Sequence, residues 1–339
     1  MPPIITEHVP LAPRTTLRVG GAAEYFTEVS SLEALRDAVA WARGEHYPVH
    51  VLGGGSNVLV SDSGVRGLVV HPTFSDITYK EVGQSVQVTA GAGVVLDTLI
   101  EALVSRELWG LENLSGIPGT VGGVPIQNVG AYGVEGKDVI VSVEAYEPLT
   151  DTVRVFSNAE CLFAYRDSYF KHEGKHLIIT SVTFALSRMP LPKLSYKDLA
   201  ERFGTVTSPT LADIRRAVID IRSAKFPDWR TKGTAGSFFK NPIISEAHYA
   251  TLRAQYPDIP GYKTDDGRVK MSLGWILDRV CGLRGYSEGT VGLFHAQALV
   301  LVCAHGTSTV AIDTFADAII ARVYAATNIS VEREVTTFN

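Results

Sequence analysis

The stretch YPVHVLGGGSN, residues 47–57, decides the fold class, because it joins a strand-like run directly to a glycine-rich turn. Glycines directly after a strand let backbone N–H groups approach a phosphate closely, and neighbouring Ser and Asn side chains add hydrogen bonds. The stretch therefore predicts a phosphate-binding loop at the end of a strand. The residues of this turn are Gly53, Gly54, Gly55, Ser56 and Asn57.

Strand and helix patterns alternate around this turn. Glu24–Val29 is typical of a strand, and the apolar residues of 32–39 have helical spacing, with Ser30 and Glu33 as a capping box. The fold class predicted is therefore α+β, with mixed sheets. Further strands are expected at 77–82, 85–90, 139–146, 152–156, 176–186, 297–302 and 329–335, and further helices at 96–103, 208–221 (with Ser208 as cap), 245–256, 272–281 and 308–326.

A second glycine-rich loop, SGIPGTVGG, spans residues 115–123. Two such loops are suited to enclosing a pyrophosphate from two sides, although each taken alone is also a plausible tight turn. The Gly-Lys-Ser/Thr of a P-loop is absent, and Gly91-Ala92-Gly93 lacks the third glycine of a dinucleotide fingerprint, so it is read as a strand-to-helix turn. The loop residues considered for cofactor binding are Ser115, Ile117, Pro118, Gly119, Gly122 and Gly123.

Bulk properties exclude several classes of protein. A length of 339 residues suggests two or three domains, and a net charge of -5 without a Lys/Arg run gives no support to a nucleic-acid partner. Three dispersed cysteines and nine histidines without metal-ligand spacing predict neither disulfides nor a metal site. The N-terminus does not resemble a leader peptide, and the apolar run 298–304 is too short to span a bilayer, so we expect a cytoplasmic protein.

Seven stretches, in order and covering nearly the whole chain, resemble the UDP-N-acetylenolpyruvoylglucosamine reductases. They are TTLRVGG (15–21), GGGSN (53–57), IPG (117–119), QNVGAYG (127–133), YRDS (165–168), GSFFKNP (236–242) and VEREV (331–335). The segment SYKDL (195–199) is similar to the tyrosine-bearing loop of the longer subtype of that family.

The resemblance implies an FAD-binding domain of the vanillyl-alcohol-oxidase-like type, made of two subdomains, plus a C-terminal α+β substrate domain. We place these parts at 1–72, 73–225 and 226–339, with the last strand free to pack back on the FAD domain. The resemblance also implies non-covalent FAD, NADPH as hydride donor, UDP-N-acetylglucosamine enolpyruvate as substrate, and a monomer.

Three residues match the family's catalytic positions. Arg166 is suited to gripping a carboxylate and stabilising developing charge, although an ion pair with Asp167 or Glu173 is the plainer reading. Ser237 matches the proton donor, although such a serine is commonly a cap or turn residue. Glu334, on a strand-like run, matches a glutamate that assists the arginine, and Arg333 stands where the family often has proline.

The remaining site residues are also carried over from the resemblance. For the substrate these are Tyr196, Lys225, Asn241 and Gln297, and for the cofactor Asn128, Gly130 and Arg222. Two other functions stay open from the sequence: an FAD-dependent sugar or lactone oxidase of the same cofactor-binding architecture, and a nucleotide-sugar sensor without catalysis. An oxidase often links flavin covalently to His or Cys, and no residue here compels such a link.

Overall fold

A computed structural model describes residues 4–204, 206 and 208–339. The chain divides into two compact units. Unit 1 comprises the segment that ends at Val9 together with Ala23–Gly55 and Arg66–Arg222. Unit 2 comprises Pro10–Ala22, Ser56–Val65 and Ser223–Asn339. The three-part division expected from the sequence stays a prediction.

Unit 1 holds two sheets, one of order β1-β2-β5-β3 and one of order β11-β10-β12-β7-β6. The predicted 77–82 and 85–90 hairpin is confirmed as β6 and β7, and 139–146 with 152–156 as β10 and β11. The strands are β1 (Thr6–Pro10), β2 (Ala22–Val29), β3 (Val49–Val51), β5 (Val65–Pro72), β6 (Ile77–Val82), β7 (Ser85–Gly91), β8 (Gly130–Ala131), β9 (Val134–Glu135), β10 (Ile140–Glu147), β11 (Thr152–Ser157) and β12 (Ile178–Ser187).

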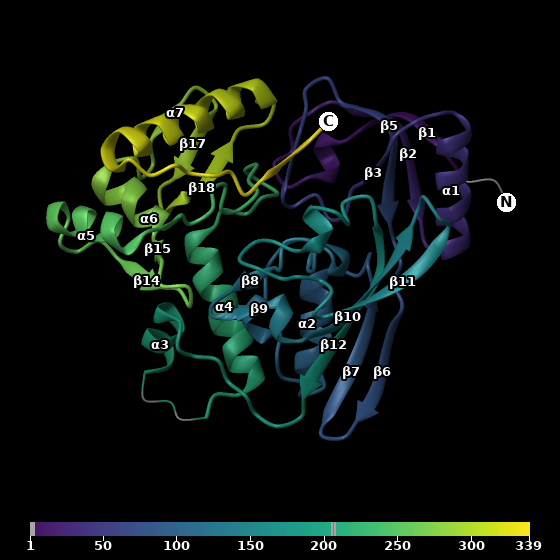
Figure 1. Ribbon diagram of the computed structural model, residues 1–339, viewed down its shortest axis with the longest axis horizontal. Helices are drawn as coiled ribbons and strands as arrows, with labels where there is room; N and C mark the ends of the chain where they lie inside the picture. Colours follow the sequence, from purple (N-terminus) through teal and green to yellow (C-terminus); the bar gives the residue numbers. More distant parts are fainter. Residues whose placement is uncertain (1–3, 205, 207) are drawn as a thin grey trace. The chain divides into compact units, whose positions relative to one another are not determined.

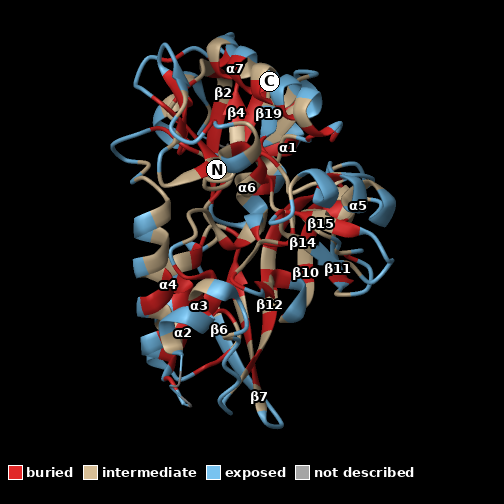
Figure 2. Ribbon diagram, turned by 90° about the vertical axis from the view of Figure 1, so that its left-hand side faces the viewer, coloured by how far each residue is buried: buried red, intermediate tan, exposed pale blue. Residues whose placement is uncertain are grey.

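Helices cover these sheets with their apolar faces. The buried residues of α2 are Leu96, Leu99, Ile100 and Leu103, the face that the helical spacing predicts. They pack on the largely buried strands β7 and β12, of which β12 is mostly red in Figure 2. The helical segments are α1 (Leu32–Gly44), α2 (Leu96–Ser105), α3 (Lys197–Phe203), α4 (Leu211–Lys225) and the short turns η2 (Glu112–Leu114), η3 (Val121–Gly123), η4 (Gly136–Asp138) and η5 (Tyr169–Lys171).

Unit 2 has its own core, in which α7 packs against β17 and β18 (Figure 1). Its sheets have the orders β16-β17-β18, β13-β15-β14 and β19-β4. The elements are η1 (Ala12–Arg14), β4 (Val58–Val60), β13 (Ile243–Ile244), α5 (Glu246–Gln255), β14 (Gly261–Lys263), β15 (Val269–Met271), α6 (Leu273–Trp275), the π-helical η6 (Ile276–Val280), β16 (Ser287–Glu288), β17 (Val291–Phe294), β18 (Gln297–Cys303), α7 (Thr309–Thr327) and β19 (Thr336–Phe338).

Two predicted helix caps are wrong by one or two residues. The cap of α1 is Ser31, not Ser30, because the Ser31 side chain accepts a hydrogen bond from the Ala34 N–H at 3.1 Å. At α4 the predicted cap Ser208 is replaced by Thr210, whose hydroxyl accepts from the Asp213 N–H at 3.1 Å. Each true cap is the hydroxyl that reaches the third following N–H group, which composition alone does not determine.

The predicted strand at 329–335 is also wrong. The apolar residues of this segment are buried in the core of unit 2: Ile329, Val331 and Val335. The alternation of apolar and polar residues therefore reflects burial, and the segment does not form a hydrogen-bonded strand. Within this segment only Arg333 forms an isolated bridge, with Phe239. The last strand is β19, which pairs in parallel with β4, from Thr336 opposite Val58 to Phe338 opposite Val60.

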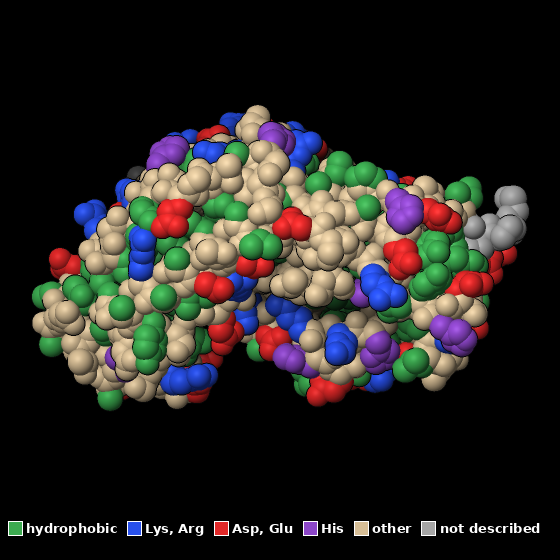
Figure 3. Space-filling model, turned by 90° about the horizontal axis from the view of Figure 1, so that it is seen from above, with side chains coloured by type: hydrophobic (Ala, Val, Ile, Leu, Met, Phe, Trp, Pro, Cys, Tyr) green, Lys and Arg blue, Asp and Glu red, His purple; other side chains and the backbone are tan. Residues whose placement is uncertain are grey.

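The surface agrees with the dispersed charge of the sequence. Acidic and basic side chains are interspersed on the face shown in Figure 3. None of the helices in the described ranges is both long enough and apolar enough to cross a membrane.

Candidate active site

The two glycine-rich loops of unit 1 touch each other through their backbones. A Cβ atom on Gly54 would lie 2.7 Å from the Cα of Gly119, and one on Gly53 would lie 3.2 Å from Thr120 Oγ1. Because no side chain tolerates the first of these contacts, position 54 must be glycine for the loops to meet. The two loops therefore lie against each other at this point, and the pyrophosphate site expected between them stays a prediction. The chain division falls after Gly55, so Ser56 and Asn57 belong to unit 2.

Backbone donors gather where these loops meet. Within the described part of the chain, the N–H groups of Gly53, Gly54, Gly55, Gly119 and Thr120 have no hydrogen-bond acceptor. Unsatisfied N–H groups on a loop with positive-φ glycines form a concave site for an anion, and Gly55 and Gly119 have φ of 61° and 125°. The arrangement therefore fits the pyrophosphate of FAD, which these donors would hold.

The second loop is clamped at Gly116, which has a φ of 71°. Its N–H donates to Asp97 Oδ1 at 2.6 Å, and its carbonyl accepts from Arg222 Nε at 3.1 Å. Asp97 also accepts from Arg215 at 3.0 Å. Burial acts to raise the pKa of Asp97, but the bonds from Arg215 and Gly116 outweigh it and hold that pKa below its ordinary value. The clamp therefore keeps a negative charge on Asp97.

Most other predicted cofactor residues shape these loops through internal contacts. Ser115 is buried and donates to the Glu112 carbonyl at 2.7 Å. Asn128 is fully buried, donates to Glu135 and Ala164, and accepts from the Lys137 N–H at 2.8 Å. Their side chains thus brace the loop. Ile117, Pro118 and Gly122 are half-buried, Gly123 is exposed, and Gly130 begins β8.

Arg166 lies on a tight turn closed by two bonds between Ala164 and Asp167. Its φ of 55° is the left-handed region, which is strained for an arginine and is found at functional positions. The guanidinium donates to the Gly130 carbonyl at 2.7 Å, so it joins the YRDS turn to the QNVGAYG loop. Asp167 accepts from His172 at 2.9 Å. The turn therefore constrains the backbone of Arg166 and so limits the directions that its side chain can take.

A row of contacts in unit 1 leads from the tyrosine loop to the second glycine loop. Tyr196 is exposed just before α3, and its ring stands edge-on to Tyr132 with 5.3 Å between centroids. Burial raises the pKa of Tyr132 to about 12, while Arg222 nearby acts to lower it. Burial also lowers the pKa of Arg222 from its ordinary value. Tyr132 thus links Tyr196 to Arg222, and it was given no role from the sequence.

In unit 2 the structure brings the Ser237 and Glu334 segments together. Phe238 lies between them: its N–H donates to the Leu299 carbonyl at 3.0 Å, and its carbonyl accepts from the Glu334 N–H at 2.8 Å. Ser237 itself is bridged to Val300 of β18. The Ser237 hydroxyl has no hydrogen-bond partner within the residues that the structure describes. The backbone pairing therefore fixes the half-buried residue Ser237 directly before Phe238, which is bonded to the Glu334 backbone.

The unit 2 residues that are expected at the substrate take part in local structure as well. Asn241 Oδ1 accepts from the Leu273 N–H at 3.0 Å and so caps α6. Gln297 Oε1 accepts from the Leu299 N–H at 3.3 Å. Asn57 donates to the Glu334 carbonyl at 3.2 Å, and Lys225 is the last residue of α4. Asn57, expected at a cofactor, thus holds the glutamate segment directly.

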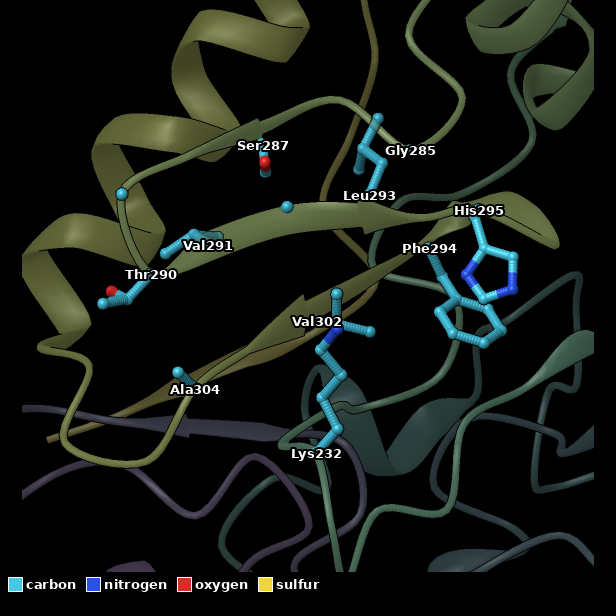
Figure 4. Close-up of a pocket in the computed structure, with 12 residues that line it drawn as sticks. Lys232, Gly285, Ser287, Thr290, Val291, Leu293, Phe294, His295, Val302 and Ala304 are labelled. Atoms are coloured by element: carbon cyan, nitrogen blue, oxygen red, sulfur yellow. The ribbon is translucent and has the colours of Figure 1, made fainter.

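A pocket of about 320 Å³ lies in unit 2 beside β17 and β18 (Figure 4). Lys232 extends toward Val302, and the rings of Phe294 and His295 lie next to each other with 4.3 Å between centroids. Among the described residues that line this pocket there is none of the predicted site residues.

Sequence reasoning missed Tyr132, Asp97 and the docking of Arg333 on α7. Tyr132 is the tyrosine of the QNVGAYG stretch, and its place in that motif was the one feature of the sequence that pointed to it. Asp97 and Arg215 are 118 residues apart, so neither pattern nor spacing reveals their pair.

Comparisons with known proteins cover both parts of the chain. A family model described as an FAD binding domain matches residues 23–155. A second model, the C-terminal domain of UDP-N-acetylenolpyruvoylglucosamine reductase, matches residues 228–338. Together they span the glycine loops and the Ser237 and Glu334 segments.

Relatives of known name match most of the chain. The UDP-N-acetylenolpyruvoylglucosamine reductase of Pseudomonas syringae is 42% identical over 298 residues, 87% of this chain and 87% of the relative. That of Neisseria gonorrhoeae is 43% identical over 299 residues, 86% of this chain and 85% of the relative. A crystal structure of UDP-N-acetylenolpyruvylglucosamine reductase from Thermus caldophilus aligns with a TM-score of 0.70 at 26% identity, covering 99% of this chain and 100% of that one.

Proposed function

The chain belongs to the UDP-N-acetylenolpyruvoylglucosamine reductase family, and from this membership we propose how its residues share the work of the reaction. It is an FAD-dependent oxidoreductase of peptidoglycan precursor synthesis that reduces UDP-N-acetylglucosamine enolpyruvate to UDP-N-acetylmuramate. Bound FAD would supply the hydride chemistry, between NADPH as donor and the terminal carbon of the enolpyruvyl group as acceptor. The residues of the chain would bind the cofactor and substrate, stabilise the developing negative charge and deliver the proton.

The observation that carries the proposal is the backbone contact between Gly54 and Gly119, with the unpaired N–H groups around it. These donors would bind the two phosphates of FAD, and the nearby guanidinium of Arg222 would add a positive charge. The clamp of Asp97 and Arg215 on Gly116 would hold the donors in position before the cofactor arrives, which lowers the entropy lost on binding.

We assign charge stabilisation to Arg166. Hydride addition to the terminal carbon places negative charge on the neighbouring carbon and, by conjugation, on the substrate carboxylate. A guanidinium on a constrained turn can grip such a carboxylate with two hydrogen bonds as the charge develops. The strained backbone at Arg166 is consistent with a side chain whose direction is set in advance.

We assign proton delivery to Ser237. The carbon next to the carboxylate must gain a proton to complete the reduction, and the Ser237 hydroxyl is a donor with no other acceptor in the described chain. An isolated serine is a weak acid, so its alkoxide needs stabilisation or rapid reprotonation through water. Glu334, whose backbone is joined to that of Phe238, would relay charge or a proton there.

The substrate would be bound by Tyr196, Lys225, Asn241 and Gln297. Lys225 would act as a compact cation for a phosphate of UDP, and the exposed Tyr196 would add its hydroxyl. We also expect the chain to act in the cytoplasm. We expect it to be a monomer, which light scattering of the purified protein would test.

A visible spectrum followed by two additions tests the proposal. The purified protein should be yellow, with one FAD per chain that is released on acid precipitation. NADPH should bleach the flavin, and the enolpyruvyl UDP-sugar should restore its colour. FMN, or no flavin even after reconstitution, would overturn the assignment. Colour that stays in the precipitate would favour the oxidase, and bleaching without recovery would favour the sensor.

A further inference from the structure

The segment that carries Glu334 is tied to its neighbour by a short piece of backbone pairing. The Glu334 N–H donates to the Phe238 carbonyl at 2.8 Å, and the Lys240 N–H donates to the Glu332 carbonyl at 2.9 Å. Both bonds flank the single bridge between Phe239 and Arg333. Each bond of this kind contributes only about 0.5–1.5 kcal/mol, so two of them leave the segment weakly held.

The side chain of Arg333 supplies a second tether, to α7. It pairs with the Asp313 carboxylate, donates to the Asp313 carbonyl at 3.0 Å and donates to Asp317 Oδ1 at 2.7 Å. Asp313 and Asp317 are four residues apart, so they lie on one face of the helix. The Arg333 side chain is 24% exposed and that of Asp313 38%, so their pair is screened less than a surface pair, whereas the 72% exposed Asp317 adds a weaker contact.

The helix that receives Arg333 is itself firmly held. Asp62 accepts from the Thr309 N–H at 2.8 Å and caps the first turn of α7, and the Thr309 hydroxyl donates to the Val60 carbonyl. The opposite face of α7 contributes Ile312, Phe315 and other residues to the core of unit 2. A guanidinium that docks on α7 therefore docks on a fixed support.

Two further tethers of this segment are weaker. Glu332 pairs with Lys240 at 2.9 Å, but its side chain is 75% exposed, so the pair contributes little. Asn57 holds the Glu334 carbonyl through one bond of 3.2 Å. Of these contacts, only those of Arg333 join the segment to a helix through several hydrogen bonds to charged groups.

We propose that Arg333 is a positioning residue for Glu334: its docking on Asp313 and Asp317 of α7 sets the direction of the glutamate side chain. Consecutive residues of an extended, bridged segment point to opposite faces. Arg333 turned toward α7 therefore directs Glu334 away from the helix. This inference rests on the proposed role of Glu334 in proton or charge relay.

The test is a double-mutant cycle between R333A and E334Q, with kcat and KM for the enolpyruvyl substrate measured at saturating NADPH. R333A should lower kcat about tenfold or more and change KM less than about threefold, because misplacement of an active-site group acts mainly on the reacting geometry. In the E334Q background, R333A should lower kcat no further. R333K should recover only part of the loss, since an ammonium lacks the flat fork that reaches three acceptors.

The matched control is R322A, which removes an arginine that belongs to α7 itself and pairs with Glu288 and Tyr286. Its kcat should stay near normal. If R333A does not fold, as judged by flavin content and thermal melting, D317N removes one contact alone and should give a smaller, equally non-additive loss. An R333A effect of equal size in both backgrounds, or none in wild type, overturns the inference alone. A normal kcat for E334Q overturns the proposed role of Glu334 and the inference with it.

Discussion

The glycine loops of unit 1 and the Ser237 segment of unit 2 are built by different means. The loops meet because Gly54 has no side chain, so that its backbone can reach Gly119. The Ser237 segment has its place because its backbone pairs with β18 on one side and with the Glu334 segment on the other. The first is a steric requirement on one residue, and the second is a set of hydrogen bonds between distant segments.

This difference decides what a substitution does. A side chain at Gly54 should disturb cofactor binding, because it separates the loops that hold the donors. A substitution of the Ser237 side chain should leave the paired backbone in place and remove only the hydroxyl. Variants at Ser237 and Gly54 test these two expectations separately.

The largest effect is expected for Ser237→Ala, which isolates chemistry from structure. Turnover should fall by about 10²-fold or more, the usual scale for the loss of a general acid, while flavin content stays normal. Ser237→Cys should retain more activity than the alanine variant, since a thiol also donates a proton. Steady-state NADPH oxidation with substrate measures this. Loss of flavin or of folding in the alanine variant would make Ser237 a structural turn residue.

The next effect is expected for Gly54→Val, which tests the steric side. Overpacking of this kind costs typically about 1–3 kcal/mol, which corresponds to roughly tenfold to hundredfold weaker FAD binding. Flavin fluorescence titration of the flavin-free protein measures it. Gly44→Ala, at the end of α1 and outside both loops, is the control, because a Cβ there meets nothing within 4 Å. Equal affinities of the two variants would show that contact of the loops is not needed for the cofactor.

The same difference explains how far the sequence was informative. The glycine loops were predictable because glycine is needed wherever backbones approach closely, whatever the partner. The β6–β7 hairpin and the faces of α2 and α4 were predictable from local periodicity. The segment 329–335 was not, because its buried alternation matches a strand while its backbone bonds depend on Phe238 and Lys240, almost a hundred residues earlier.

The residues of the candidate site fall into the same two groups: those that local sequence predicts and those that depend on distant partners. Ser237, Arg166 and Glu334 were found through their motifs, and the structure adds why they are held: a bridge, a constrained turn and a pairing. Tyr132 and Asp97 were missed because their importance lies in partners that only the fold brings near them. The residues proposed for the chemistry were thus visible in local motifs, whereas the tertiary contacts that hold them were not.

A third prediction concerns Arg166, which was identified from a local motif and lies on a turn with a strained backbone. Arg166→Lys keeps the charge and loses the two-pronged contact, so turnover should fall at least about tenfold. Arg154→Lys, in an exposed pair with Glu160, is the control and should be near normal. Near-normal turnover of Arg166→Lys would assign the arginine to structure, through its bond to the Gly130 carbonyl.

The smallest effect is expected at Asp97, which supports the glycine loops without touching the point where they meet. Its pKa lies below the ordinary value of 3.8, because the bonds from Arg215 and Gly116 outweigh the effect of burial. A depressed pKa in the folded state means that the carboxylate contributes stability above its unfolded pKa and loses it as the pH falls through the folded pKa. Asp97→Asn should therefore lower the free energy of unfolding by about 1 kcal/mol near neutral pH.

The pH dependence separates that contribution from a packing defect. The difference in unfolding free energy between wild type and Asp97→Asn should be constant above about pH 5 and shrink as the pH falls below about 4, because Asp97 then binds a proton in the unfolded chain before it does so in the folded one. Urea unfolding of flavin-saturated protein at several pH values measures it. Asp37→Asn is the control, since it removes a carboxylate that has no partner among the described residues. A difference that stays the same down to pH 3 would mean that asparagine disturbs the loop by its shape. The charge on Asp97 would then have no part in the clamp, and the glycine loops would be held by sterics alone.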